Sequence, residues 1–302
     1  MTRAAQIARL NASIGNAGVP AIRIIVVGDS LSHGGAGGAT DGATAAGKAW
    51  LCYKSDTVTQ IGPMSKAYNK LGGWGWHVPF ANELYALTGL RTVWVPMGYN
   101  GTAVTVEGRS DANWDFAAPL NAGNLTVIPS WAGENRSTIL PNSTDALSDL
   151  CGLTVTQTWV IEVDSWHEEG ALINSATMSS SRVTGSMGDM YDWFAANHGA
   201  TRLYFVRAGV IGVDQAAVTA NEAAYAYPTV RTAQMAAENA NIWCCFQNAN
   251  DVGSPFNTLT VDGNGRWSAG SERYDGTHWS EAYANCVGKT MAYNIAVREG
   301  LI

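Results

Sequence analysis

The chain has 302 residues, of which 46% are hydrophobic and 14% are charged, and its formal net charge is −7. This length and apolar content suffice for one large hydrophobic core, so we expect a single elaborated domain over residues 1–302. The negative charge and the lack of a lysine and arginine cluster exclude nucleic acid and anionic membranes from the expected partners.

Residues 1–10 have the pattern of a short amphipathic helix and lack the uninterrupted apolar core of a signal peptide. No apolar run is long enough to cross a bilayer. We therefore expect neither a signal peptide nor a transmembrane segment. The location of the protein stays open, because a phage virion component or an enzyme acting outside the cell would show the same features. A homo-oligomer is also open, since virion components often form one.

Strands are expected where short apolar, β-branched runs occur, at 22–27, 91–95, 158–163, 202–206 and 241–246. Helices are expected at 76–87, 188–197, 222–240, where Pro228 restarts or kinks the helix, and 280–298. Strands separated by enough chain for a crossover helix form parallel sheets. We therefore predict an α/β fold, a three-layer α/β/α sandwich around a doubly wound, five-stranded parallel sheet of the flavodoxin-like kind.

Two long segments, 33–73 and 103–156, interrupt this scheme as loop insertions. Segments of this length are usually functional or separately folded. The chain has 12 tryptophans, several of them in these segments or near the expected catalytic edge: Trp50, Trp74, Trp114, Trp131, Trp166, Trp267 and Trp279. An uncharged rim of aromatic rings would suit a sugar, whereas the plainer interpretation is that most of these rings are core.

The chain has five cysteines and no Cys-x-x-Cys pair, which is too few and too scattered for a disulfide framework. Cys244 and Cys245 lie in a run that we expect to be a buried strand. Cys52 and Cys151 fall in expected loops, and whether they pair is left open.

The block 28–32, Gly-Asp-Ser-Leu-Ser, directly follows the first expected strand, and the block 275–278, Asp-Gly-Thr-His, precedes the last expected helix. A serine hydroxyl attacks a carbonyl only with a base to take its proton, and histidine oriented by a carboxylate is the usual base. Each block alone is also an ordinary turn. Together, and at one edge of the sheet, they predict a catalytic triad of Ser30, Asp275 and His278.

These residues resemble the SGNH or GDSL-type serine hydrolases, in particular the carbohydrate O-acetylesterases. The resemblance implies an oxyanion hole that includes the backbone N–H of Ser30 and that of a glycine after the second strand, for which we choose Gly101 over Gly98. The asparagine of the family's third block is missing after 158–163, so Ser165 and His167 are candidates for the third donor. Loss of one donor would cost roughly 10²–10³ in turnover.

The other histidines, His33, His77 and His198, have structural interpretations. His167 is followed by two glutamates, but the zinc-protease pattern needs a second histidine one helical turn later, which is absent. We expect no metal and no cofactor.

Three functions follow from this pattern. The first is a serine esterase that removes O-acyl groups, with acetyl favoured, from a carbohydrate or a small-molecule ester by an acyl-enzyme mechanism. The second is a lipase or thioesterase of the same family, and the third is a glycan-binding module on a hydrolase scaffold that has lost turnover.

Overall fold

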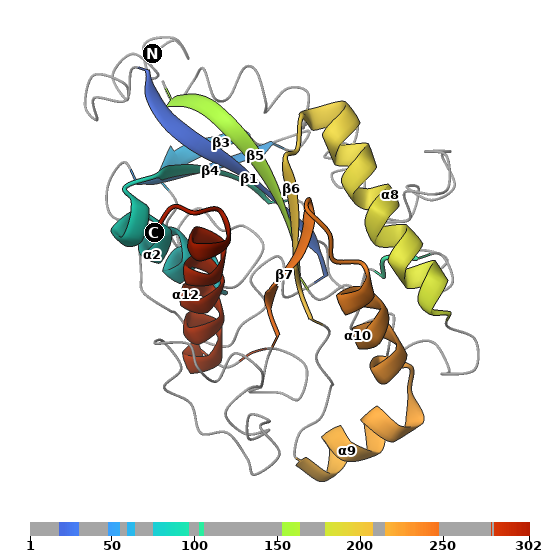
Figure 1. The fold of residues 1–302 in the computed structure, drawn as a ribbon. Helices are drawn as coiled ribbons and strands as arrows, with labels where there is room; N and C mark the ends of the chain where they lie inside the picture. Colours follow the sequence, from blue (N-terminus) through green and yellow to red (C-terminus); the bar gives the residue numbers. More distant parts are fainter. Residues whose placement is uncertain are drawn as a thin grey trace.

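The computed structural model describes residues 18–29, 48–54, 59–63, 75–96, 103–105, 153–163, 179–207, 215–247, 279 and 281–302 (Figure 1). The strands are β1 (Val19–Gly28), β2 (Ala49–Lys54), β3 (Thr59–Pro63), β4 (Arg91–Pro96), β5 (Leu153–Val163), β6 (Arg202–Val206) and β7 (Ile242–Phe246). The helices are α2 (His77–Thr88), α8 (Ser180–His198), α9 (Gln215–Ala224), α10 (Tyr227–Ala236) and α12 (Glu281–Arg298).

The strands form one seven-stranded sheet in the order β3-β2-β4-β1-β5-β6-β7. All neighbouring strands are parallel except β2 and β3, which are antiparallel. The predicted α/β fold is confirmed, and the five predicted strands are β4, β1, β5, β6 and β7, in the flavodoxin-like order. The sheet is larger than predicted, because β2 and β3, from within the segment 33–73, extend it beyond β4. Cys52 accordingly lies in a strand and not in a loop.

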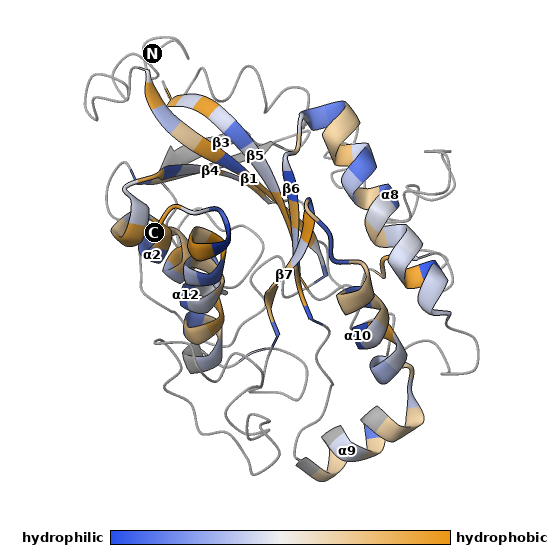
Figure 2. Cartoon of the chain, in the orientation of Figure 1, coloured by the Kyte–Doolittle hydropathy of each residue, from blue (hydrophilic) through white to orange (hydrophobic). Residues whose placement is uncertain are grey.

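The central strand β1 is buried on both faces, because helices cover the sheet on both sides. Its near-continuous apolar run is typical of such a strand. The residues that pack with α8 and α10 are Ala21, Ile25 and Val27. The residues that pack with α2 and α12 are Ile22, Ile24 and Val26. Figure 2 shows hydrophobic residues concentrated along the strands and mixed with hydrophilic ones on the helices.

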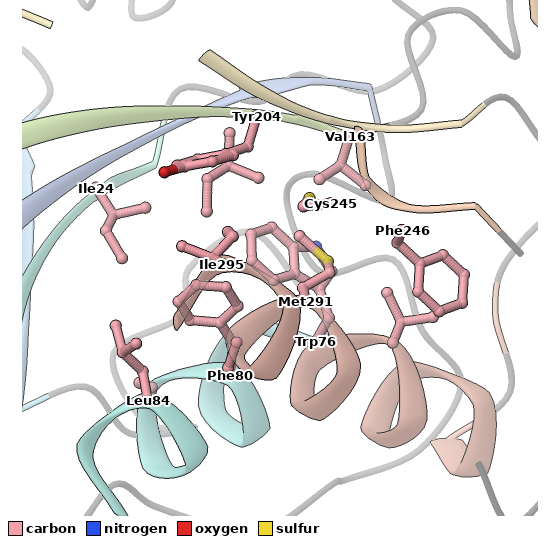
Figure 3. Close-up of a cluster of buried hydrophobic side chains, with 14 of the residues drawn as sticks. Ile24, Trp76, Phe80, Leu84, Val163, Tyr204, Cys245, Phe246, Met291 and Ile295 are labelled. Carbon is pink, nitrogen blue, oxygen red and sulfur yellow. The ribbon is translucent and has the colours of Figure 1, made fainter. Parts of the chain in front are cut away.

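Two helical layers complete the sandwich, with α2 and α12 on one side of the sheet and α8 and α10 on the other (Figure 1). Between α2, α12 and the sheet, Trp76, Phe80, Met291 and Ile295 fill the core (Figure 3). The three-layer architecture therefore agrees with the prediction. Among the described residues, no helix is long and apolar enough to cross a membrane.

Two helices differ from the expected ones. Helix α8 begins at Ser180 and not at 188, because Ser179 caps it by accepting a hydrogen bond from the Arg182 backbone N–H at 3.2 Å. The segment expected as one helix at 222–240 is two, α9 and α10, and Pro228 lies in the first turn of α10. Proline is favoured there because its missing N–H has no partner to lose.

Helices α2 and α12 approach each other closely at Gly288. A Cβ atom placed on this glycine would lie 2.2 Å from the Trp76 backbone oxygen and 3.0 Å from the Phe80 backbone nitrogen. Backbone atoms cannot move aside as a flexible side chain can. Only glycine therefore fits at this crossing.

We predict that Gly288→Ala lowers the free energy of unfolding by about 1–3 kcal/mol or more, since it overpacks the crossing. Urea unfolding measures the change. The control is Gly185→Ala on the exposed face of α8, where a Cβ meets nothing within 4 Å. That variant should gain roughly 0.5–1 kcal/mol from helix propensity. Equal effects at both positions would contradict the close approach.

A buried cation and a buried histidine meet where α8 ends. Arg23 of β1 donates a hydrogen bond from Nη2 to the His198 backbone oxygen at 2.5 Å. The His198 ring lies against Trp193, with ring centroids 5.1 Å apart, and is itself buried. Burial, and secondly the Arg23 charge, lower the pKa of His198 to about 4.

This lowered pKa predicts a pH dependence of stability. The unfolded chain binds a proton at His198 near pH 6.5 and the folded chain only near pH 4. The part of the free energy of unfolding that depends on a neutral His198 is therefore fully present above pH 6.5. It is lost as the pH falls toward 4, by at most about 1.4 kcal/mol per pH unit. Urea unfolding across this range should show a steeper loss for the wild type than for His198→Gln. Parallel curves would exclude His198 as the source.

Candidate functional site

The described residues include the sequence neighbours of the candidate site. The predicted site residues themselves lie outside the described part of the chain: Ser30, Gly101, Ser165, His167, Asp275 and His278. The triad and the oxyanion donors therefore stay predictions, and the structure bears on them through the neighbouring residues Asp29 and Trp279 and through the strand ends that precede the candidate residues.

The ends of β1 and β5 lie side by side at the carboxyl edge of the sheet. In this parallel pair Gly28 is opposite Val163. The chain continues from β1 to β4 on one side, whereas β5 and the later strands lie on the other. The β1/β5 boundary is thus the topological switch point, where open α/β sheets bind their ligands. In sequence, Ser30 follows the end of β1 by two residues and Ser165 follows the end of β5 by two.

The chain turns sharply where β1 ends. Gly28 has a backbone φ of 131°, a conformation that residues other than glycine rarely adopt. The next residue, Asp29, is 1% exposed. The central strand therefore ends in a glycine with positive φ and a buried aspartate. Ser30 is the next residue in the sequence.

A buried carboxylate that the sequence analysis missed lies at the same edge. Glu162, the penultimate residue of β5, is 1% exposed and lies opposite Val27 of β1 and Phe205 of β6. Because strand residues alternate, it shares the α8 and α10 face of the sheet with Val160. Its signal in the sequence is a single charged residue within an otherwise apolar run.

Trp279 is the described residue next to the candidate base. It is 2% exposed, and its ring lies edge-on to Tyr283 in the first turn of α12, with centroids 5.6 Å apart and an interplanar angle of 78°. Tyr283 in turn lies edge-on to Phe246, the last residue of β7, at 6.0 Å. The chain therefore enters α12 from a fixed, buried position.

The described histidines have the structural roles expected for them. His77 begins α2, is buried, and stacks on Trp76 with ring centroids 4.3 Å apart. His198 ends α8. Within the described ranges, no three histidines, cysteines or carboxylates are grouped to hold a metal ion. Cys244 and Cys245 are buried in β7, as predicted, and each Sγ donates to a backbone oxygen, that of Phe246 and that of Phe205.

The described tryptophans favour the core over a sugar-binding rim. Trp50, Trp76, Trp94, Trp159 and Trp279 are at most 2% exposed. Trp50 and Trp279, two of the candidates for a sugar-binding rim, therefore present no free ring face. The other candidates for such a rim lie outside the described residues: Trp74, Trp114, Trp131, Trp166 and Trp267.

No protein-family model matches the chain, and no curated protein matches its sequence. Solved structures match it at low identity. XAC1771, a novel carbohydrate acetylesterase from Xanthomonas citri, aligns at 13% identity and a TM-score of 0.51, over 93% of this chain and 57% of that one. NanS aligns at 11% identity and a TM-score of 0.49, over 95% of this chain and 97% of that one. Est24, a carbohydrate acetylesterase from Sinorhizobium meliloti, aligns at 12% identity and a TM-score of 0.40, over 92% of this chain and 99% of that one.

The chain shares the fold of XAC1771. The α/β fold that the resemblance to SGNH-type hydrolases implied is thereby confirmed, whereas membership of that superfamily stays a prediction from the motifs. At such low identity the likeness assigns no residue and no substrate to this chain. The chain also spans only about half the length of XAC1771, so the activity of that whole protein does not transfer.

The turn at Gly28 yields a stability prediction. Gly28→Ala should lower the free energy of unfolding by about 2 kcal/mol or more, because a Cβ at this φ is strained. Gly89→Ala at the left-handed C-cap of α2, where φ is 71°, is the matched control and should cost about 1 kcal/mol. Urea unfolding compares them. A Gly28→Ala protein as stable as the wild type would show that the turn does not require glycine.

Proposed function

We propose that this protein is a serine esterase that removes O-acyl groups, chiefly acetyl, from a carbohydrate. The observation that carries the proposal is the end of β1. At the switch point of the sheet the central strand ends in a glycine with positive φ and a buried aspartate, and the next residue is Ser30. The fold shared with a carbohydrate acetylesterase supports the choice of reaction and of acyl group.

The proposed reaction has two steps. The Ser30 hydroxyl attacks the ester carbonyl and gives its proton to His278, while Asp275 orients the imidazole. The tetrahedral intermediate collapses to an acyl enzyme, and the sugar hydroxyl leaves with the proton from His278. Water, deprotonated by His278, then attacks the acyl group, and the carboxylic acid leaves as Ser30 recovers its proton.

The backbone N–H groups of Ser30 and Gly101 are the proposed oxyanion donors, with Ser165 or His167 as the third. The pairing of β1 with β5 supports Ser165. Gly28 is opposite Val163, and Ser30 and Ser165 each follow their strand end by two residues. A serine hydroxyl or a histidine N–H can replace the missing asparagine, since each donates a hydrogen bond.

Hydrolysis of p-nitrophenyl acetate tests the proposal. Ser30→Ala should lower kcat at least about 10³-fold, because the nucleophile is lost. Ser181→Ala, on an exposed part of α8, is the control and should keep the wild-type rate. Rates should fall from acetyl to butyryl and longer esters, and acetylated glycans should then release acetate.

Other outcomes identify the alternatives. A preference for long acyl chains would indicate a lipase or thioesterase with an apolar acyl channel. Equal and negligible rates for the wild type and Ser30→Ala would contradict an esterase. Glycan binding without turnover would then favour the third function, a binding module.

A further inference from the structure

The segment that carries Asp275 and His278 leaves the described structure after β7 and returns to it at Trp279. Its two ends are joined by three aromatic rings in edge-on contact, which we call the aromatic brace: Phe246, Tyr283 and Trp279. Each ring of the brace is at most 2% exposed. Figure 3 shows Phe246 on the side of the sheet that faces α12.

The geometry of the brace is well defined. Both of its contacts are edge-on, with centroids 5.6 Å apart between Trp279 and Tyr283 and 6.0 Å apart between Tyr283 and Phe246. Aromatic rings in this arrangement attract each other through their quadrupoles. Large buried rings in a close-packed core also have few alternative positions. The backbone at Trp279 is therefore fixed relative to the carboxyl end of β7.

The placement of a catalytic base is sensitive to small shifts. The base must lie about 2.6–3.2 Å from the hydroxyl that it deprotonates. A displacement of about 1 Å can cost roughly 10²-fold in rate. His278 is bonded to Trp279 through one peptide, so a backbone shift at Trp279 is passed directly to the base.

We propose that Trp279 is a positioning residue that holds the base His278 in register with the nucleophile through the aromatic brace. This role rests on the proposed esterase function. It goes beyond ordinary core packing, because it predicts an effect on turnover that equal burial elsewhere does not produce.

Trp159 of β5 provides the matched control. It belongs to the same hydrophobic cluster, is 1% exposed, and lies edge-on to Tyr204 with centroids 5.6 Å apart and an interplanar angle of 83°. It differs in place, because it is opposite Ile24 and Arg202, away from the carboxyl edge. Removal of either ring should thus disturb the core alike.

The test compares Trp279→Leu and Trp279→Phe with Trp159→Leu and Trp159→Phe in the full chain, on p-nitrophenyl acetate. Trp279→Leu should lower kcat about 10²-fold with KM changed less than about 3-fold. It should also move the acidic limb of the kcat/KM pH profile, which reports the free base. Trp159→Leu should lower the urea midpoint similarly but keep kcat within about 3-fold of the wild type.

The phenylalanine variants decide the matter if a leucine variant does not fold. Trp279→Phe keeps an aromatic ring and should lower kcat only about 10-fold, whereas Trp159→Phe should change it less than about 2-fold. Equal kcat values for the two phenylalanine variants, with an active and Ser30-dependent wild type, overturn the positioning role alone. A wild type without Ser30-dependent hydrolysis overturns the esterase function as well.

Discussion

Burial of β1 on both faces is the constraint on which the rest of this structure depends. A strand with helices on both sides must be apolar on both sides, and β1 meets this demand with alternate residues packed toward α8 and α10 and toward α2 and α12. Its neighbours β4 and β5 pair with it in parallel, so the switch point of the sheet falls at its carboxyl end. The position proposed for the nucleophile is thus a consequence of packing in the core.

The second half of the proposed site depends on how α12 is held. The close approach at Gly288 fixes α12 against α2, and the rings of Trp279, Tyr283 and Phe246 fix its first turn against β7. These contacts lie within one hydrophobic cluster on one face of the sheet. The core that stabilises the fold therefore also fixes Trp279, the residue that directly follows the block containing Asp275 and His278.

The sequence predicted the sheet better than its surroundings. The five apolar runs were recognisable because strands buried on both faces need them, whereas β2 and β3 mix polar with apolar residues and lie within a glycine- and alanine-rich stretch. The start of α8 was missed because serine and glycine are weak helix formers, and the cap at Ser179 outweighs them. Tryptophan burial was open to two interpretations, because an aromatic ring suits a core as well as a sugar, and only the packing around Trp50 and Trp279 decides between them. Glu162 was missed because one charged residue does not change the apolar pattern of a strand.

The most direct test of the account is covalent labelling with an organophosphonate ester, which phosphonylates activated serines, followed by peptide mapping. Such a reagent reacts with a serine whose proton is taken by a neighbouring base and whose oxyanion is stabilised, and an ordinary surface serine lacks both. We expect one adduct, on Ser30, with loss of ester hydrolysis in proportion to labelling and no adduct in His278→Ala. An adduct on another serine, or full labelling of Ser30 with hydrolysis intact, would contradict it.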